Sequence, residues 1–238
     1  MCYNIAARQQ VDELENKYGV KPDAELAAHG YYHVTGFAHP KLPVLVQENG
    51  KRFELMQWGL IPSWAKSEEK AKEFSNMTLN TKAETIFEKS MFKYSIIQRR
   101  CILPVDGFYE WRDVGKMKYP YYIFPKDKGI FSLGCIYDTW INKTTGEVLS
   151  SFSIITTEAN EIMAMIYNSG KRMPLILDDI GWQEWIDPKT TKKKIQSLLK
   201  PSPNEILRYH TISHTISHRN MDTNYPDVQN EVLYSWNK

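Results

Sequence analysis

Long apolar runs and a strong net charge are both missing from this chain of 238 residues. No stretch approaches the roughly 18 apolar residues of a membrane-spanning helix, and the first residues contain no apolar signal segment. The three cysteines, Cys2, Cys101 and Cys135, lack the spacing of a zinc site, and their odd number argues against a framework of disulfides. We therefore expect a soluble, cytoplasmic protein in a reducing compartment, with no membrane contact.

The charge of the chain provides no long-range attraction for a polyanion, because 30 basic residues are offset by 28 acidic ones. Any contact with nucleic acid must then come from a local basic patch. Aromatic residues, by contrast, make up 13% of the chain and include seven Trp. Such rings must pack in a core or bind a partner. Since no segment looks like a linker, the length suits one domain over residues 1–238.

Strand patterns dominate the middle of the chain, where apolar or alternating runs are separated by turn dipeptides such as Asp106-Gly107. The expected strands are 53–58, 101–105, 108–111, 119–124, 130–137 and 148–157, the last three as successive meander strands. Helical spacing of apolar or charged residues predicts helices over 9–18, 65–74, 158–166 and 190–199. The chain is therefore expected to be an α+β protein rich in β-structure.

Glu110 is an isolated carboxylate among aromatic residues just after a turn. In a strand, Glu110 shares a face with Phe108, while Tyr109 and Trp111 share the other face. Two interpretations stay open at this level. Glu110 lies on a solvent face or strand edge, as is usual for this residue type, or it is a desolvated carboxylate used for proton transfer.

Cys2 follows the initiator Met1, and a small second residue normally permits removal of that Met. Cys2 would then carry a free α-amine with a pKa of about 7.7–8.0 beside a thiol with a pKa of about 8.5, so both groups are partly nucleophilic near neutral pH. Together they capture an aldehyde, because the amine forms a Schiff base and the thiol then closes a thiazolidine ring. Taken alone, a Cys in second position is more often a coincidence.

Two Trp residues and a pair of cations allow either a structural or a binding role. Trp58 ends a predicted strand and Trp64 lies in the turn that follows, so each ring belongs to the core or stacks on a base. Lys171 and Arg172 adjoin a loop-to-strand junction, where they bind an anion or lie in a solvated loop.

The segment 78–85 carries the pattern of a helix start. Asn80 or Thr81 is a natural N-cap, and Glu84 lies three residues beyond Thr81, as in a capping box. This capping explains the segment fully in structural terms. The expected helix N-terminus, with Lys82 in its first turn, would also suit a phosphate.

Three histidines near the C-terminus, His210, His214 and His218, are spaced by four residues. On a helix this spacing would gather ligands for a metal. The Thr and Ile residues between them favour a strand instead, on which neighbouring His lie about 13 Å apart. One ion cannot bridge that distance, so we expect no metal site, and the sequence indicates no cofactor.

Several short segments match one family when they are taken together. They are Cys2 after Met1, Trp58 to Trp64, Asn80 to Thr85, Arg100 to Pro104, Gly107 to Trp111, Phe152 to Thr156, Ala159-Asn160 and Arg172 to Pro174. With these segments the chain resembles the SOS response-associated peptidase (SRAP) family, the abasic-site shield proteins. The resemblance implies a single mixed domain with a barrel-like sheet core and peripheral helices.

The resemblance also implies a function, which would make the protein an autopeptidase and a lyase-like crosslinking enzyme. Such a protein exposes Cys2 by removing Met1 and captures the aldehyde of an abasic site in single-stranded DNA as a thiazolidine. We expect it to act as a monomer in the cytoplasm and to associate with the nucleoid when bound to DNA.

Site residues follow from the same resemblance. Cys2 would be the nucleophile, Glu110 the carboxylate that manages protons at the α-amine, and Asn80 a polar contact that holds the reacting end. The residues expected in or near the DNA groove are Trp58, Trp64, Lys82 and Arg172.

The chain departs from the family pattern at two places. The family has a His shortly before its Arg-Met-Pro motif, where it is an acid/base in opening the sugar and reversing the crosslink. Counting without a gap places Gly170 there, and allowing a short insertion places Tyr167 there. With an unperturbed pKa near 10, Tyr167 donates a proton but is a poor base at pH 7.

The second departure concerns charge. The family commonly has Gly-Arg after the Cys and Asn-Ala-Arg in the helix-opening motif, whereas this chain has Tyr3-Asn4 and Asn80-Thr81-Lys82. Lys82 keeps the charge without the bidentate fork of Arg. We therefore expect slower ring opening or reversal, or weaker DNA binding.

Two further functions stay open. A noncovalent single-stranded DNA-binding module would lack efficient chemistry and would bind intact and abasic strands equally. The third function is a general thiol peptidase acting on other proteins, although no His shows a motif-level pairing with a Cys.

Overall fold

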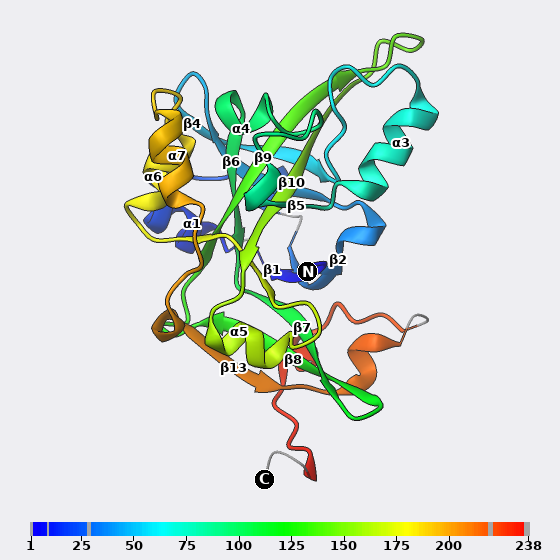
Figure 1. Cartoon of the computed structure of the whole chain (residues 1–238), viewed down its shortest axis with the longest axis vertical. Helices are drawn as coiled ribbons and strands as arrows, with labels where there is room; N and C mark the ends of the chain where they lie inside the picture. The colour runs from blue at the N-terminus through cyan, green and yellow to red at the C-terminus, as the bar shows by residue number, and fades with distance from the viewer. Residues whose placement is uncertain (1, 9, 28–29, 219–220, 236–238) are drawn as a thin grey trace.

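Two long strands organise the computed structural model, which describes residues 2–8, 10–27, 30–218 and 221–235. They are β9 (Phe131–Ile141) and β10 (Val148–Glu158), which pair over residues 135–141 and 148–154. Three further strands, β3 (Lys41–Gln47), β4 (Lys51–Trp58) and β6 (Arg100–Val105), connect β10 back to β9 through successive pairings. The expected barrel-like core is thus confirmed as a closed five-stranded barrel (Figure 1).

Short strands extend the barrel at the edges of β9 and β10. They are β5 (Asn80–Lys82), β11 (Arg172–Pro174) and β12 (Ile176–Leu177). All six residues of β6 are buried, which agrees with an apolar run that has both of its faces covered.

A second sheet of five antiparallel strands lies against one end of the barrel (Figure 1). Its order is β13 (Leu207–Thr211), β8 (Met117–Pro125), β7 (Gly107–Val114), β1 (Asn4–Ala7) and β2 (Tyr31–Thr35). The chain passes from the barrel to this sheet at Asp106, between β6 and β7. This passage brings β1 to the junction of the two sheets.

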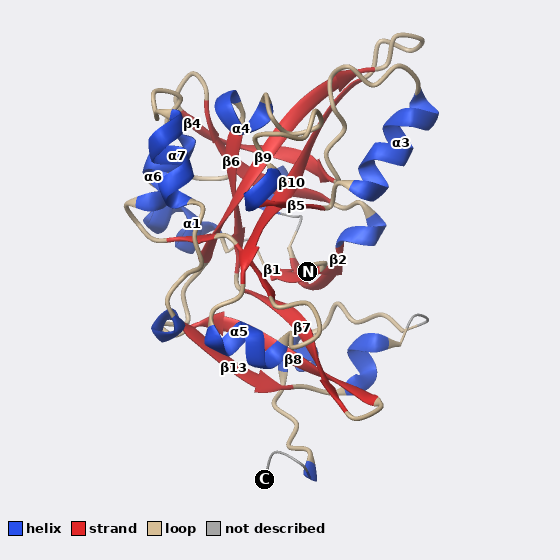
Figure 2. Ribbon diagram, viewed as in Figure 1, coloured by secondary structure: helices blue, strands red, loops and turns tan. Residues whose placement is uncertain are grey.

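Helices lie at the periphery of the strands (Figure 2). They are α1 (Val11–Tyr18), α2 (Ala24–Ala27), α3 (Glu68–Met77), α4 (Ser95–Gln98), α5 (Glu161–Ile166), α6 (Gly181–Ile186) and α7 (Lys192–Leu198). The four predicted helices are confirmed as α1, α3, α5 and α7 with shifted ends. α1 stops at Gly19, whose φ of 67° is left-handed, as the sequence predicts. α6 was not predicted, because Trp182 and Trp185 are both buried and so short a helix has no clear polar face.

The predicted helix start at 80–85 is wrong. Residues 80–82 form β5, which pairs in parallel with β10 from Ile154 to Thr156. Residues 83–85 make a single 3₁₀ turn, and no side chain caps its first residue. The exposed edge of β10 offered backbone hydrogen bonds that outweighed the local capping pattern. A turn of three residues has no appreciable dipole, so the expected phosphate site at a helix N-terminus is also wrong.

Two predictions about strands are corrected as well. β8 and β9 belong to different sheets, so the three strands do not form one meander. The strand predicted through the three histidines ends at Thr211, and a 3₁₀ turn occupies His214–Ser217. The Ser213 side chain accepts a hydrogen bond from the Thr215 N–H and caps that turn, a local preference of Ser that competes with strand pairing.

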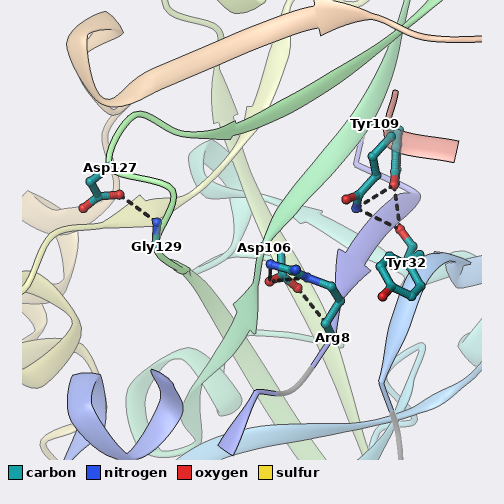
Figure 3. Close-up of polar contacts among 7 residues, drawn as sticks. Arg8, Tyr32, Asp106, Tyr109, Asp127 and Gly129 are labelled. Atoms are coloured by element: carbon teal, nitrogen blue, oxygen red, sulfur yellow. Dashed lines mark hydrogen bonds and ion pairs between the residues drawn. The ribbon is translucent and has the colours of Figure 1, made fainter. Parts of the chain in front are cut away.

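Asp106 stabilises the connection between the two sheets through hydrogen bonds to Arg8 (Figure 3). Its carboxylate accepts hydrogen bonds from the backbone N–H of Arg8 at 2.6 Å and from Nε and Nη2 of Arg8 at 2.9 and 2.6 Å. The backbone N–H of Asp106 donates to the Ala6 carbonyl at 2.8 Å. Gly107 follows because a Cβ there would lie 2.5 Å from the Ile123 carbonyl oxygen. β1 is therefore fixed in register beside β7.

Asp106→Ala is expected to destabilise the fold by about 2–3 kcal/mol, because it leaves Arg8 without its buried partner. For a chain of this length that loss lowers the Tm by about 5–10 °C, measured by thermal denaturation. Asp127→Ala is the matched control, since Asp127 is an exposed turn residue whose carboxylate accepts one hydrogen bond, from Gly129 N–H (Figure 3). Equal losses in the two variants would contradict this role of Asp106.

Candidate active site

The pairing of β1 with β7 brings the start of the chain to Glu110. Asn4 is opposite Tyr109, and Ile5 is opposite Phe108. One further step along both strands sets Tyr3 beside Glu110. The Tyr3 carbonyl accepts a hydrogen bond from Gly36 N–H at 2.8 Å, so the backbone is held on its other side as well. Cys2 and Glu110 are thus brought together by strand register, not by a loop.

Glu110 is a buried carboxyl group with 4% of its surface exposed. Burial raises its pKa to about 7, because a low-dielectric environment disfavours the charged form. The nearby Lys118 opposes this shift. A carboxyl group with this pKa both accepts and donates a proton at neutral pH. Of the two interpretations left open by the sequence, the desolvated carboxylate is the one that agrees with this burial.

Cys2 is fully buried and its thiol is free. Burial raises the pKa of this thiol well above its usual value, and the nearby Glu110 carboxylate and Cys135 raise it further. The sulfur is therefore a neutral thiol in this structure. A reaction at this sulfur needs a base to take the proton, and Glu110 is close enough to influence the thiol.

Asn80 contributes an amide to the same place. Its side-chain oxygen and nitrogen are buried, and neither has a hydrogen-bond partner of normal length among the described residues. The amide nevertheless lies close enough to the Tyr3 hydroxyl to influence its pKa. A buried amide with open donor and acceptor positions is suited to hold a polar ligand.

Tyr167 follows α5 and lies near the carboxyl group of Glu110. Burial raises the pKa of Tyr167, and the charges of Glu110 and Tyr3 raise it further. A Cβ added at Gly170 would lie 2.2 Å from the Tyr167 ring. Of the two residues that alignment with the family allows in place of His, Tyr167 therefore faces the site and Gly170 packs under its ring.

A cleft of about 730 Å³ opens onto Glu110 and Tyr167, whereas neither Cys2 nor Asn80 is among its lining residues. Its walls include Tyr3, Glu110, Lys118, Tyr167 and His214. The volume is within the range of small-molecule sites, which is enough for a nucleotide. Sequence patterns did not single out Tyr3, Lys118 or His214 for this site. Tyr3 reaches the cleft through the pairing of β1 with β7, and His214 reaches it from the C-terminal segment, so both depend on contacts between distant segments that no local pattern indicates.

The expected DNA-contacting Trp residues differ in exposure. Trp58 is completely buried, its Nε1–H donates to the Leu79 carbonyl at 2.8 Å, and its ring stacks on Phe152 with centroids 6.2 Å apart. It is a core residue in this structure and cannot stack on a base, which corrects that expectation. Trp64 is 45% exposed and makes a T-shaped contact with Phe74, so part of its side chain is accessible.

The two cationic residues expected to contact DNA, Lys82 and Arg172, also differ in exposure. Lys82 is exposed, two residues after Asn80 on β5. Arg172 instead makes a bidentate ion pair with Glu84 at 2.7 and 3.0 Å and donates to the Thr156 carbonyl at 2.6 Å. Its side chain is 13% exposed. Arg172 therefore connects β11 to the turn after β5, and its guanidinium is already bound by Glu84 and Thr156.

Residues 2–8, 10–27, 30–218 and 221–235 contain neither a cluster of metal ligands nor a membrane-spanning helix. Among them, no three His, Cys, Asp or Glu side chains are grouped as ligands for one metal ion. None of the helices in the described ranges is long and apolar enough to cross a membrane.

Comparison with known proteins identifies the family. The family model described as SOS response associated peptidase (SRAP) matches residues 1–219. The abasic site processing protein YoaM of Bacillus subtilis is 34% identical over 238 residues, which cover 98% of this chain and 100% of YoaM. The abasic site processing protein YoqW of the same organism is 32% identical over 222 residues, 91% of this chain and 94% of YoqW. A crystal structure of a protein from Bacteroides thetaiotaomicron superposes with a TM-score of 0.90 at 37% identity, over 98% of this chain and 100% of that one. The chain belongs to the SOS response associated peptidase (SRAP) family.

Proposed function

We propose that this protein processes abasic sites in single-stranded DNA by covalent capture through Cys2. Its relatives YoaM and YoqW are named abasic site processing proteins. The observation that carries the proposal is the buried carboxyl group of Glu110, with a pKa of about 7, held by strand pairing next to Cys2. A proton-transfer group beside an N-terminal Cys is what aldehyde capture requires.

The reaction has three steps once Met1 has been removed. The α-amine of Cys2 adds to the aldehyde carbon C1′ of the opened sugar, giving a carbinolamine. Loss of water then gives a Schiff base, with Glu110 donating the proton that leaves in the water. Finally the Cys2 sulfur bonds to C1′ of the protonated Schiff base while its proton passes to Glu110, and the electron pair of the C=N bond returns to the nitrogen, which closes a thiazolidine with a neutral ring N–H.

Three further residues, none of which lines the cleft, would support this chemistry in different ways. The open amide of Asn80 would hold the sugar hydroxyl or the carbinolamine oxygen. Trp64 and Lys82 are accessible for stacking on a base and for a phosphate. Removal of Met1 by the protein itself would hydrolyse the Met1–Cys2 peptide bond at the same carboxyl group.

A labelled single-stranded oligonucleotide with one abasic site tests the proposal. Incubation with the purified protein is expected to give a species that survives a denaturing gel, and intact mass is expected to show a protein that lacks Met1. The matched controls are an intact strand and an abasic strand whose aldehyde has been reduced to an alcohol with borohydride. Retention of Met1, or equal amounts of crosslink with the reduced strand, would contradict covalent capture through Cys2.

The accessible Trp64 and Lys82 also favour a second candidate, a noncovalent single-strand binding module. It predicts no species on the denaturing gel and equal, salt-dependent affinity for intact and abasic strands. The complete burial of Cys2 does not favour the third alternative, a peptidase that cleaves other proteins.

A further inference from the structure

Capture of an abasic site begins with a closed sugar. An abasic deoxyribose is mostly a cyclic hemiacetal, and only its open form presents an aldehyde to an amine. Opening breaks the bond between C1′ and the ring oxygen, so an acid must protonate that oxygen while a base removes the proton of the C1′ hydroxyl. Glu110 as the carboxylate serves as the base. It cannot be the acid in the same step, so the cleft must supply a second proton donor.

Tyr3 lies on the same face of the sheet as Glu110. Ile5 is opposite Phe108 in the β1–β7 register, and side chains two residues further along each strand return to the same face. Tyr3 and Glu110 are those residues. Both line the 730 Å³ cleft, so a sugar bound at this part of the cleft can contact both side chains.

The Tyr3 ring is held in place from several sides. Its centroid is 4.9 Å from that of Phe37, at an interplanar angle of 35°, and its backbone carbonyl is fixed by Gly36 N–H. The Asn80 amide lies close enough to the Tyr3 hydroxyl to lower its pKa. Burial raises the pKa of Tyr3, Asn80 opposes that shift and Glu110 adds to it. The phenol is therefore fully protonated at neutral pH and is a donor, not a base.

We propose that the Tyr3 hydroxyl is the acid that opens the abasic sugar, an assignment that rests on the proposed function. Tyr3 donates its proton to the ring oxygen as the C1′–oxygen bond breaks. Glu110 takes the proton of the C1′ hydroxyl as the C1′ carbonyl forms. The proton then returns from Glu110 to the phenolate, and both groups are restored.

Tyr167 is the other phenol of the cleft, and its surroundings favour a supporting role. It lies near Glu110, Tyr3 and Asp113, whereas Tyr3 lies near both Asn80 and Glu110 and directly follows the nucleophile. Tyr3 is therefore the phenol placed where C1′ must bind. Tyr167 is positioned to pass the proton from Glu110 back to Tyr3.

Two substrates separate ring opening from the later steps. One is an oligonucleotide with a natural abasic site, and the other carries an open-chain aldehyde arm without any hydroxyl that could close a ring. Tyr3→Phe keeps the ring that packs on Phe37 and removes the proton. We expect it to slow crosslinking of the natural site by about 100-fold, the usual contribution of a general acid, and to change the rate with the open-chain aldehyde by less than about threefold.

Any other pair of rates for Tyr3→Phe would contradict the assignment of Tyr3 as the acid. Wild-type rates with both substrates would show that its hydroxyl is not used, and equal slowing with both would show that it only shapes the site. A selective loss in Tyr167→Phe, without one in Tyr3→Phe, would assign the proton to Tyr167. Failure of the wild-type protein to link even the open-chain aldehyde would overturn the proposed function itself, so the two failures are distinguishable.

Discussion

Cys2→Ala is expected to remove all stable crosslink to abasic single-stranded DNA, because no thiol remains to close the ring onto C1′. The small Ala side chain still permits removal of Met1, so the variant keeps an α-amine that forms a Schiff base. Without treatment this imine hydrolyses, and no product remains on a denaturing gel. With borohydride added during the incubation, the imine is reduced and a crosslink reappears. The two gels together separate the role of the thiol from that of the amine.

Cys101→Ala is the matched control for Cys2→Ala. Cys101 is also a buried, free cysteine, and it lies opposite Cys135 in the β6–β9 pairing, outside the cleft described above. This variant is expected to crosslink at the wild-type level without borohydride. A stable crosslink in Cys2→Ala without borohydride would show that another nucleophile captures the aldehyde.

Glu110→Gln is expected to slow crosslinking by about 100-fold or more, because the site loses the group that takes and returns protons. Gln preserves the shape and hydrogen-bonding capacity of the side chain but cannot titrate. The rate is measured by quenching the reaction with the abasic oligonucleotide at successive times. Glu147→Gln, at an exposed position, is the control and should keep the wild-type rate. A rate for Glu110→Gln within threefold of the wild type would contradict the role of Glu110.

The same variant has a second measurable effect, on stability. The pKa of Glu110 is raised to about 7 in the folded protein, so the folded state binds its proton more tightly than the unfolded state. The resulting stabilisation is complete below the unfolded pKa of about 4.3 and is lost as the pH rises through 7. We expect wild type to lose about 3 kcal/mol relative to Glu110→Gln between pH 4 and pH 8. Denaturant unfolding at the two pH values measures this difference.

The parts of the fold that the sequence predicted are those set by local pattern. β6, β7 and β10 carry continuous or alternating apolar runs that end at turn residues, and the alternation alone placed Glu110 on the face of Phe108. The helices with one apolar stripe were predicted for the same reason. The closing of the barrel was expected from the family resemblance and not from any local pattern.

The incorrect predictions concern residues whose structure depends on contacts between segments that are distant in the sequence. Asn80 and Lys82 carry a good capping pattern but pair with the edge of β10 instead, about 75 residues away in sequence. Trp58 is in a family motif, yet Leu79 and Phe152 enclose it. Tyr3 was not singled out from the sequence because its neighbours, Glu110 and Asn80, become visible only once β1 is paired.

The pairing of β1 also determines when the site can exist. β1 pairs with β2 early in the chain, but its second partner is residues 107–109 of β7, and His214 completes a wall of the cleft. Translation at roughly 5–20 residues per second separates Cys2 from His214 by about 10–40 s. A Cys2 freed of Met1 early in that interval lacks both Glu110 and the wall of the cleft that contains His214. If Cys2 captures aldehydes as proposed, it would be open to small aldehydes in solution before the cleft is complete, and fast folding of the C-terminal segment would shorten this period.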